Sequence, residues 1–239
     1  VEIDADGIVW VATRGGGLNR LDPATGAVTV YRAGDPAAGN LASDEVMALL
    51  IDHRGWLWVG TDGGGLHRLD PQTGRFARYA HDPENADSLS HDTVTTLHQD
   101  ADHVIWVGTF SGGLNKMMEG ENGAVSFERF TADPNQPDSL SRIHVRAVVS
   151  DERGRLWVGT EDGLNLLDQR SGTFRVYRTE PTDPNSLADS YVMSLFQDRA
   201  GLLWVGTRSG GVSRWNPRSW SMGLHSNSWL RSSSVTGLA

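Results

Sequence analysis

Two sets of positions carry the residues in this chain that could recognise a ligand. One residue follows each of five recurring threonines, and its chemistry changes every time: Arg14, Asp62, Phe110, Glu161 and Arg208. A second residue precedes a recurring valine and changes as freely: Glu45, Thr93, His144, Tyr191 and Ser234. Arginine, carboxylate, aromatic and histidine groups together suit a site that binds a small polar ligand by hydrogen bonds and stacking. Ordinary variation in surface loops would give the same pattern, so both interpretations stay open.

The sequence contains none of the patterns that indicate catalysis, a metal or a cofactor. It has no cysteine, and its eight histidines include no closely spaced pair of a zinc pattern. There is no serine elbow and no phosphate loop that leads into a helix. Loops such as 82–88 are rich in oxygen ligands, but they lack the spacing of a calcium loop, and solvated turns explain their composition. We therefore expect no catalytic residue, metal or cofactor in this segment.

A sequence repeat places the two sets of positions. The pattern Trp-Val-Gly-Thr, with alanine for glycine in the first copy, occurs five times. Its tryptophans are 48, 48, 51 and 47 residues apart: Trp10, Trp58, Trp106, Trp157 and Trp204. A fixed period of this length is typical of propellers and solenoids. Because each tryptophan has apolar neighbours on a predicted strand, we expect a structural role, with the ring packed between sheets rather than stacked on a sugar.

A single repeat reads as four short antiparallel strands. Its composition predicts strands over 46–52, 56–61, 66–69 and 76–79, separated by turns that contain Asp, Gly or Asp-Pro. The glycine run at 63–65 fits a hairpin turn better than a phosphate cradle. The third copy is longer, with an insertion at 117–124. Four such strands make one blade, so the predicted fold class is an all-β propeller of four-stranded antiparallel blades. First strands lie innermost in a propeller, so both sets are expected on one face of the ring, the second set at the rim of its channel.

The repeats divide the chain into approximate blades at 1–45, 46–93, 94–144, 145–191 and 192–234, with the start of a further blade at 235–239. We expect one propeller domain over 1–239. Two arrangements fit: a five-bladed ring in which 235–239 completes the first blade, or part of a larger propeller. Both ends stop within a strand position and neither terminal repeat is atypical, which favours the larger propeller.

The composition of the chain argues against two classes of partner, nucleic acids and membranes. The net charge is −9, with twenty arginines, a single lysine and no basic stripe, which is a poor match to a phosphate backbone. We therefore expect no nucleic-acid partner. No run approaches the roughly 18 apolar residues of a membrane span, so we expect no membrane contact from this segment.

The unit x-Leu-Trp-Val-Gly-Thr-x-Gly-Gly-Leu, with Asp-Pro and Ser-Leu in the linkers between copies, resembles the two-component regulator propeller repeat. The resemblance covers essentially the whole chain. It implies a periplasmic sensor propeller, usually of seven blades, that precedes a β-sandwich, a membrane helix and a histidine kinase or diguanylate cyclase. Known members often sense glycans. The resemblance thus implies a small polar ligand such as an oligosaccharide, and a homodimer through the propeller or adjoining domains.

The expected function is a non-catalytic, ligand-sensing module of a bacterial signalling receptor. Two other classes remain open. Propellers host lyases and quinone-dependent dehydrogenases, and the Asp-Pro-x-Thr-Gly turns at 22–26 and 70–74 resemble quinoprotein repeats. A protein-interaction scaffold would instead use aromatic residues outside the repeated position, for which Trp220 and Trp229 are candidates.

Overall fold

The chain folds into five four-stranded antiparallel sheets. The computed structural model describes residues 1–120, 122–216 and 221–225. Within this part the only helix is the short 3-10 turn η1 (Pro36–Ala38). Trp220, Trp229, Ser234 and the predicted further strand at 235–239 lie outside the described residues.

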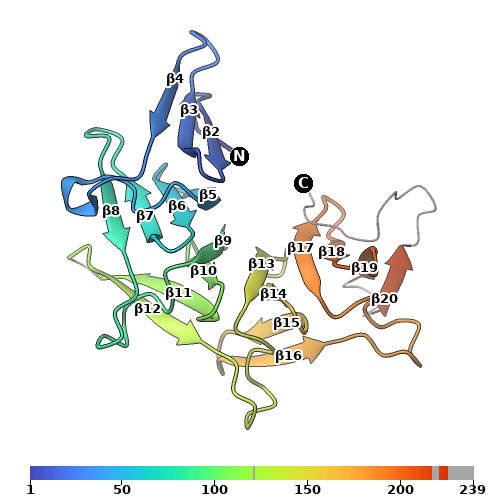
Figure 1. Cartoon of the computed structure of the whole chain (residues 1–239). Helices are drawn as coiled ribbons and strands as arrows, with labels where there is room; N and C mark the ends of the chain where they lie inside the picture. Colours follow the sequence, from blue (N-terminus) through green and yellow to red (C-terminus); the bar gives the residue numbers. More distant parts are fainter. Residues whose placement is uncertain (121, 217–220, 226–239) are drawn as a thin grey trace. The chain divides into compact units, whose positions relative to one another are not determined.

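Each sheet is made of consecutive strands in chain order, as the colours of Figure 1 show. The first sheet contains β1 (Glu2–Ile3), β2 (Val9–Thr13), β3 (Gly17–Leu21) and β4 (Val28–Tyr31). The second contains β5 (Val46–Ile51), β6 (Leu57–Thr61), β7 (Gly65–Leu69) and β8 (Phe76–Tyr79). The third contains β9 (Val94–Gln99), β10 (Ile105–Thr109), β11 (Leu114–Glu119) and β12 (Val125–Phe130).

The fourth sheet contains β13 (Val145–Ser150), β14 (Leu156–Thr160), β15 (Gly163–Asp168) and β16 (Thr173–Tyr177). The fifth contains β17 (Val192–Gln197), β18 (Leu203–Thr207), β19 (Val212–Asn216) and β20 (Ser221–His225). By their contacts the residues form two compact units, Val1–Arg129 and Phe130–Ala239. Within the first unit β5 lies beside β9, and within the second β13 lies beside β17.

The recurring tryptophan is tied to a recurring aspartate. Its indole Nε1–H donates to Oδ2 of the aspartate six residues earlier, at 2.7–3.0 Å in every sheet. The other oxygen, Oδ1, caps the turn by accepting backbone N–H groups, as at Asp52 from Arg54 and Trp56. Turns that contain aspartate and a packed tryptophan were both predicted, but the bond between the two residues was not. The five pairs are Asp4–Trp10, Asp52–Trp58, Asp100–Trp106, Asp151–Trp157 and Asp198–Trp204.

The core lies between successive sheets of each unit. Trp58 and Leu66 of the second sheet pack with Val94, Ile105 and Val107 of the third. Equivalent clusters form between the first and second sheets and between the fourth and fifth. The tryptophan side chains that face a following sheet are buried, with an exposed fraction of 7% at Trp10 and 0% at Trp58 and Trp157. The predicted core position of the repeated tryptophan is therefore observed.

The glycine of Trp-Val-Gly-Thr makes room for the neighbouring sheet. A Cβ atom on Gly60 would lie 2.5 Å from Cγ1 of Val94, the first residue of β9. Gly159 has the same relation to Val192 in the second unit. A side chain at either position would push the first strand of the next sheet away. The first copy carries Ala12 here instead.

A polar residue on the third strand holds the linker that leads into its sheet. Asn115 Oδ1 accepts the backbone N–H of Ser90 at 3.0 Å, and Asn165 Oδ1 accepts that of Ser141 at 2.9 Å. His67 Nε2 accepts from Ala42 in the same way at 3.1 Å. Ser213 completes the series with Ala188. These buried side chains fix the linkers that carry the second set of candidate residues.

Two details differ from the sequence-based expectation. Residues 114–119 form one strand, β11, so the extra length at 117–124 extends a strand and its following turn rather than filling the turn alone. His103 stands where the other copies have glycine and adopts φ 65°, which a non-glycine residue rarely does. Its ring stacks on His53 with centroids 4.0 Å apart, a contact that no glycine could make.

Candidate ligand-binding site

A one-residue bulge reorients a variable side chain near the start of four first strands. The pairing register shifts around the second residue of each strand. Such a bulge bends the strand and re-aims one side chain. No role was predicted for this position from the sequence, although its residues differ between copies: Met47, Thr95, Arg146 and Met193. Arg146 alone among them is charged.

The two predicted sets of residues meet at one end of the second, third, fourth and fifth sheets. In the second, third and fifth sheets, the residue after the threonine donates its backbone N–H to the carbonyl of the residue before the first strand. These bonds run from Asp62 to Glu45 at 2.9 Å, from Phe110 to Thr93 at 3.0 Å and from Arg208 to Tyr191 at 3.0 Å.

In the second unit this geometry gathers five side chains, which we call the rim cluster: His144, Arg146, Glu161, Tyr191 and Arg208. His144 Nδ1 lies 2.7 Å from Oε1 of Glu161, and the Tyr191 hydroxyl donates to the same oxygen at 2.7 Å. Arg146 Nη2 donates to the Tyr191 hydroxyl at 2.7 Å and lies 3.6 Å from Glu161. The guanidinium carbons of Arg208 and Arg146 lie 5.0 and 5.5 Å from the centroid of the Tyr191 ring. Four predicted residues and one missed residue thus form a single network.

Burial and charge set the protonation states of the rim cluster. Burial, reinforced by the charge of Arg146, lowers the pKa of His144, whose exposed fraction is 6%. Burial would raise the pKa of Glu161, but the Tyr191 hydrogen bond, His144 and Arg146 hold it below its usual range. Burial and the bond to Glu161 raise the pKa of Tyr191. At neutral pH the network therefore holds a carboxylate, a neutral phenol and two guanidinium groups.

The turn between β14 and β15 in the fourth sheet is shorter than the equivalent turns of the other sheets. The turn Glu161-Asp162-Gly163 has one residue fewer than its counterparts in the other copies. The Thr160 hydroxyl consequently bonds to the carbonyl three residues ahead, whereas the threonines of the other copies reach four residues ahead. Two adjacent carboxylates, Glu161 and Asp162, are brought to this end of the sheet as a result.

The predicted residues of the first unit are less connected. The Thr93 hydroxyl donates to Asp62 Oδ1 at 2.8 Å and accepts the Gly63 N–H at 3.2 Å. This bridge from one sheet to the next has the same pattern as Tyr191 to Glu161. Arg14, Glu45 and Phe110 are exposed.

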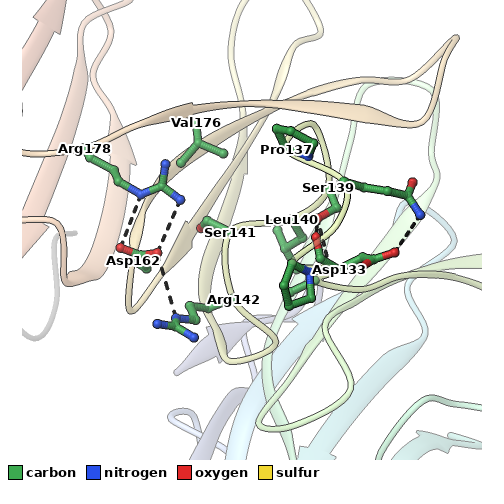
Figure 2. A pocket seen from close by; sticks show the side chains of 12 residues that line it. Asp133, Pro137, Ser139, Leu140, Ser141, Arg142, Asp162, Val176 and Arg178 are labelled. Carbon is green, nitrogen blue, oxygen red and sulfur yellow. Dashed lines mark hydrogen bonds and ion pairs between the residues drawn. The ribbon is translucent and has the colours of Figure 1, made fainter.

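A cavity lies beside the same turn of the second unit, between the linker 132–142 and the fourth sheet (Figure 2). Its volume is about 260 Å³. Arg178 donates from Nε and Nη2 to the two oxygens of Asp162, at 3.3 Å each. Arg142 Nε lies 3.9 Å from Asp162 Oδ2. Pro137, Leu140 and Val176 contribute apolar surface.

Residues 1–120, 122–216 and 221–225 contain neither a candidate metal centre nor a candidate membrane-spanning helix. No three His, Cys, Asp or Glu side chains gather there as a metal site would require. In the same residues, no helix has the length and apolar character needed to cross a membrane.

Consecutive four-stranded antiparallel sheets, with first strands side by side within each unit, define the chain as a β-propeller protein. The match to known families is specific. The two component regulator propeller family matches residues 40–63, 88–111, 139–162 and 186–209, each spanning a linker, a first strand and the Trp-Val-Gly-Thr strand. The chain belongs to this family, as the repeat pattern predicted.

Solved structures share the fold. The extracellular domain of the two component system BT3049 from B. thetaiotaomicron has a TM-score of 0.72 and 23% identity, over 98% of this chain and 28% of that chain. PorZ, a surface component of the type-IX secretion system of Porphyromonas gingivalis, has a TM-score of 0.75 and 18% identity, over 99% of this chain and 35% of its own. Virginiamycin B lyase from Staphylococcus aureus has a TM-score of 0.63 and 16% identity, over 92% of this chain and 67% of its own. Comparison with curated proteins found no match.

This chain thus spans about a third or less of the two-component and secretion-system proteins that it resembles. At these identities the likeness establishes the fold. The function must be argued from the residues.

Proposed function

We propose that this chain is a ligand-sensing propeller module of a bacterial signal-transduction receptor, and that it is not itself an enzyme. The observation that carries the proposal is the rim cluster. On a frame that repeats from copy to copy, the positions that vary hold a buried histidine, a tyrosine, a glutamate and two arginines in hydrogen-bonding or stacking contact. Such convergent polar groups beside an aromatic ring are what a site for a small polar ligand needs.

The proposed ligand is small and polar, and an oligosaccharide fits these groups. Tyr191 offers a ring and a hydroxyl, and Arg208 offers guanidinium N–H groups that make no hydrogen bond or ion pair within the described residues. The predicted residues of the first unit, Arg14, Glu45, Asp62, Thr93 and Phe110, are proposed to contribute in the same way.

Membership of the two-component regulator propeller family supports a periplasmic location for this module, and the extracellular placement of the BT3049 domain agrees with it. A kinase or cyclase elsewhere in the parent protein would supply the output. Homodimers would form through the propeller or its adjoining domains. The lyase likeness is a likeness of fold, and no cluster of the described residues supports a lyase or quinone site.

The test is a thermal-shift screen of the purified chain against oligosaccharides and small periplasmic metabolites. A hit is then titrated by calorimetry into wild type and into Arg208→Ala and Phe110→Ala variants. The proposal expects at least one saturable ligand whose affinity falls when Arg208 is removed. Failure to bind any compound, or binding that is unchanged in both variants, would contradict it.

A further inference from the structure

The cavity in Figure 2 is separate from the rim cluster and has its own set of charged residues. Its wall holds two arginines and one aspartate whose contacts are long for charged groups. Charge-assisted N–H···O bonds are usually about 2.7–2.9 Å. This chain makes such bonds elsewhere, at 2.8 Å between Arg54 and Glu119 and at 2.7 Å between Arg155 and Asp151. The Asp162 carboxylate therefore satisfies neither cavity arginine well.

Comparison between copies shows that Arg178 has lost a partner. Arg32 occupies the same position at the end of the first sheet, and its Nη1 donates to the carbonyl of Gly15 at 2.9 Å. The turn of the fourth sheet is one residue shorter, and within the described residues Arg178 makes no such bond to a turn carbonyl. Arg178 instead makes two 3.3 Å contacts with Asp162, and its remaining donors are unused within the described residues.

Arg142 is a second cation with spare donors. Serine, histidine and aspartate stand at its position in the other described linkers, as Ser43, His91 and Asp189. Its side chain is 64% exposed, and its one ion pair within the described residues is the 3.9 Å approach to Asp162, beyond hydrogen-bond range. Two guanidinium groups thus share one carboxylate on this wall.

A second acidic side chain, Asp133, lines the cavity but does not neutralise the charge of the two arginines. Asp133 Oδ1 accepts the N–H of Asn135 at 2.9 Å, and Oδ2 accepts from Gln136 Nε2 at 2.7 Å. Figure 2 shows this carboxylate on the far side of the cavity from Arg178. Both carboxylate oxygens of Asp133 therefore already accept hydrogen bonds within their own turn. Because both guanidinium groups would repel a cation, the cavity favours an anion.

We propose that this cavity binds an oxyanion, a sulfate, phosphate or carboxylate group, between Arg142 and Arg178. The anion accepts N–H bonds from both guanidinium groups, and Asp162 competes for the same donors. The apolar side chains of Pro137, Leu140 and Val176 line the remaining part of the cavity. A volume of about 260 Å³ limits the occupant to a single small group, free or carried by a larger molecule.

The test titrates sodium sulfate into the purified chain and follows the melting temperature, with sodium chloride at matched ionic strength as reference. Sulfate also stabilises proteins by exclusion from their surface, so the variants must separate the two effects. Arg142→Ala and Arg178→Ala are each expected to weaken the saturable sulfate effect about ten-fold, as loss of a charged hydrogen bond should. Asp162→Asn is expected to strengthen it about five-fold, because a competing negative charge is removed.

Arg170→Ala is the matched control, since Arg170 is an exposed arginine on the turn between β15 and β16 and does not line the cavity. Circular dichroism checks that each variant folds. A sulfate effect that is equal in wild type, Arg142→Ala, Arg178→Ala and Arg170→Ala would overturn the proposal, as would the absence of any saturable effect in wild type. Parallel titrations with phosphate and with glucuronate distinguish a free ion from an acidic group on a sugar ring.

Discussion

Single residues hold each sheet together through the aspartate–tryptophan pair. Asp52 is buried and accepts N–H groups from Trp58 Nε1 and from the backbone of Arg54 and Trp56, at 2.9–3.0 Å, and from Arg54 Nη2 at 3.4 Å. Truncating it would leave the buried indole N–H without an acceptor, which costs about 1–3 kcal/mol, and would also undo the turn. The pair therefore links a turn to the core of the next interface.

We predict that Asp52→Ala lowers the free energy of unfolding by about 3 kcal/mol in urea titrations. Asp70→Ala is the control, since Asp70 also caps a turn of the same sheet, through Gln72 and Thr73, but at the surface. Its loss should cost less than about 1 kcal/mol. Equal losses in the two variants would show that the tryptophan bond contributes nothing.

His67 makes stability depend on pH. Burial is the main cause that lowers its pKa to about 4, and its Nε2 must stay unprotonated to accept the Ala42 N–H. The unfolded chain takes up this proton near pH 6.5, and the folded chain takes it up only near pH 4. Stability from this residue is thus complete above about pH 6.5 and is lost as the pH falls toward 4. Burial lowers the pKa of His98 to about 4 as well, so it adds to the same trend.

Asparagine replaces His67 in three other copies, as Asn19, Asn115 and Asn165. We predict that His67→Asn folds and reduces the loss of unfolding free energy between pH 7 and pH 4.5 by roughly a third, because His98 and His144, whose pKa values are also lowered, still titrate. Denaturant titrations at the two pH values measure this. An unchanged pH dependence would mean that His67 is not the buried neutral group described above.

At the scale of the strands, the glycine of Trp-Val-Gly-Thr governs how closely sheets approach. We predict that Gly60→Ala costs about 1–3 kcal/mol, since its Cβ would lie 2.5 Å from Val94 Cγ1. Adding Val94→Ala should recover about 1 kcal/mol in a double-mutant cycle, because it removes the Cγ1 atom and leaves Val94 Cβ, at 3.0 Å, as the nearest atom. Strictly additive effects on unfolding free energy would contradict this contact.

The strands could largely be predicted from the sequence. Because the same pattern recurs in five copies, a segment that is ambiguous in one copy can be assigned from the others. The strand expected at 46–52 is observed at Val46–Ile51, and that at 76–79 matches Phe76–Tyr79. The rim cluster was predicted in part for the same reason, because His144, Glu161, Tyr191 and Arg208 hold fixed places in the repeat. Arg146 was missed because a bulge is a property of strand pairing, and sequence alone does not give that pairing.

The cavity was missed for a different reason. It depends on a turn that is one residue shorter and on the side chain of Arg142 in a variable linker, neither of which follows the repeat. Variation between copies was nevertheless a usable signal at both places. The positions that differ from their counterparts, Arg142, Arg146 and the Glu161-Asp162 turn, are those that build the two candidate sites.

At the scale of the molecule, a repeated frame supports a few positions that are free to vary. We propose that these positions, above all the rim cluster, bind a ligand, while the Trp-Val-Gly-Thr strands support them. Glu161 and Tyr191 also bridge successive sheets, as Asp62 and Thr93 do. A purely structural role would therefore change stability without changing ligand affinity.

The most direct test is the calorimetric Kd of a ligand from the screen for Tyr191→Phe and Tyr177→Phe. Tyr191→Phe keeps the ring but removes the hydroxyl that joins Arg146 to Glu161. The Tyr177 hydroxyl is buried and has no hydrogen-bond partner among the described residues, so its removal is the matched control. The account predicts about ten-fold weaker binding for Tyr191→Phe and an unchanged Kd for Tyr177→Phe. The same Kd in both variants and in wild type would contradict a ligand site at the rim cluster.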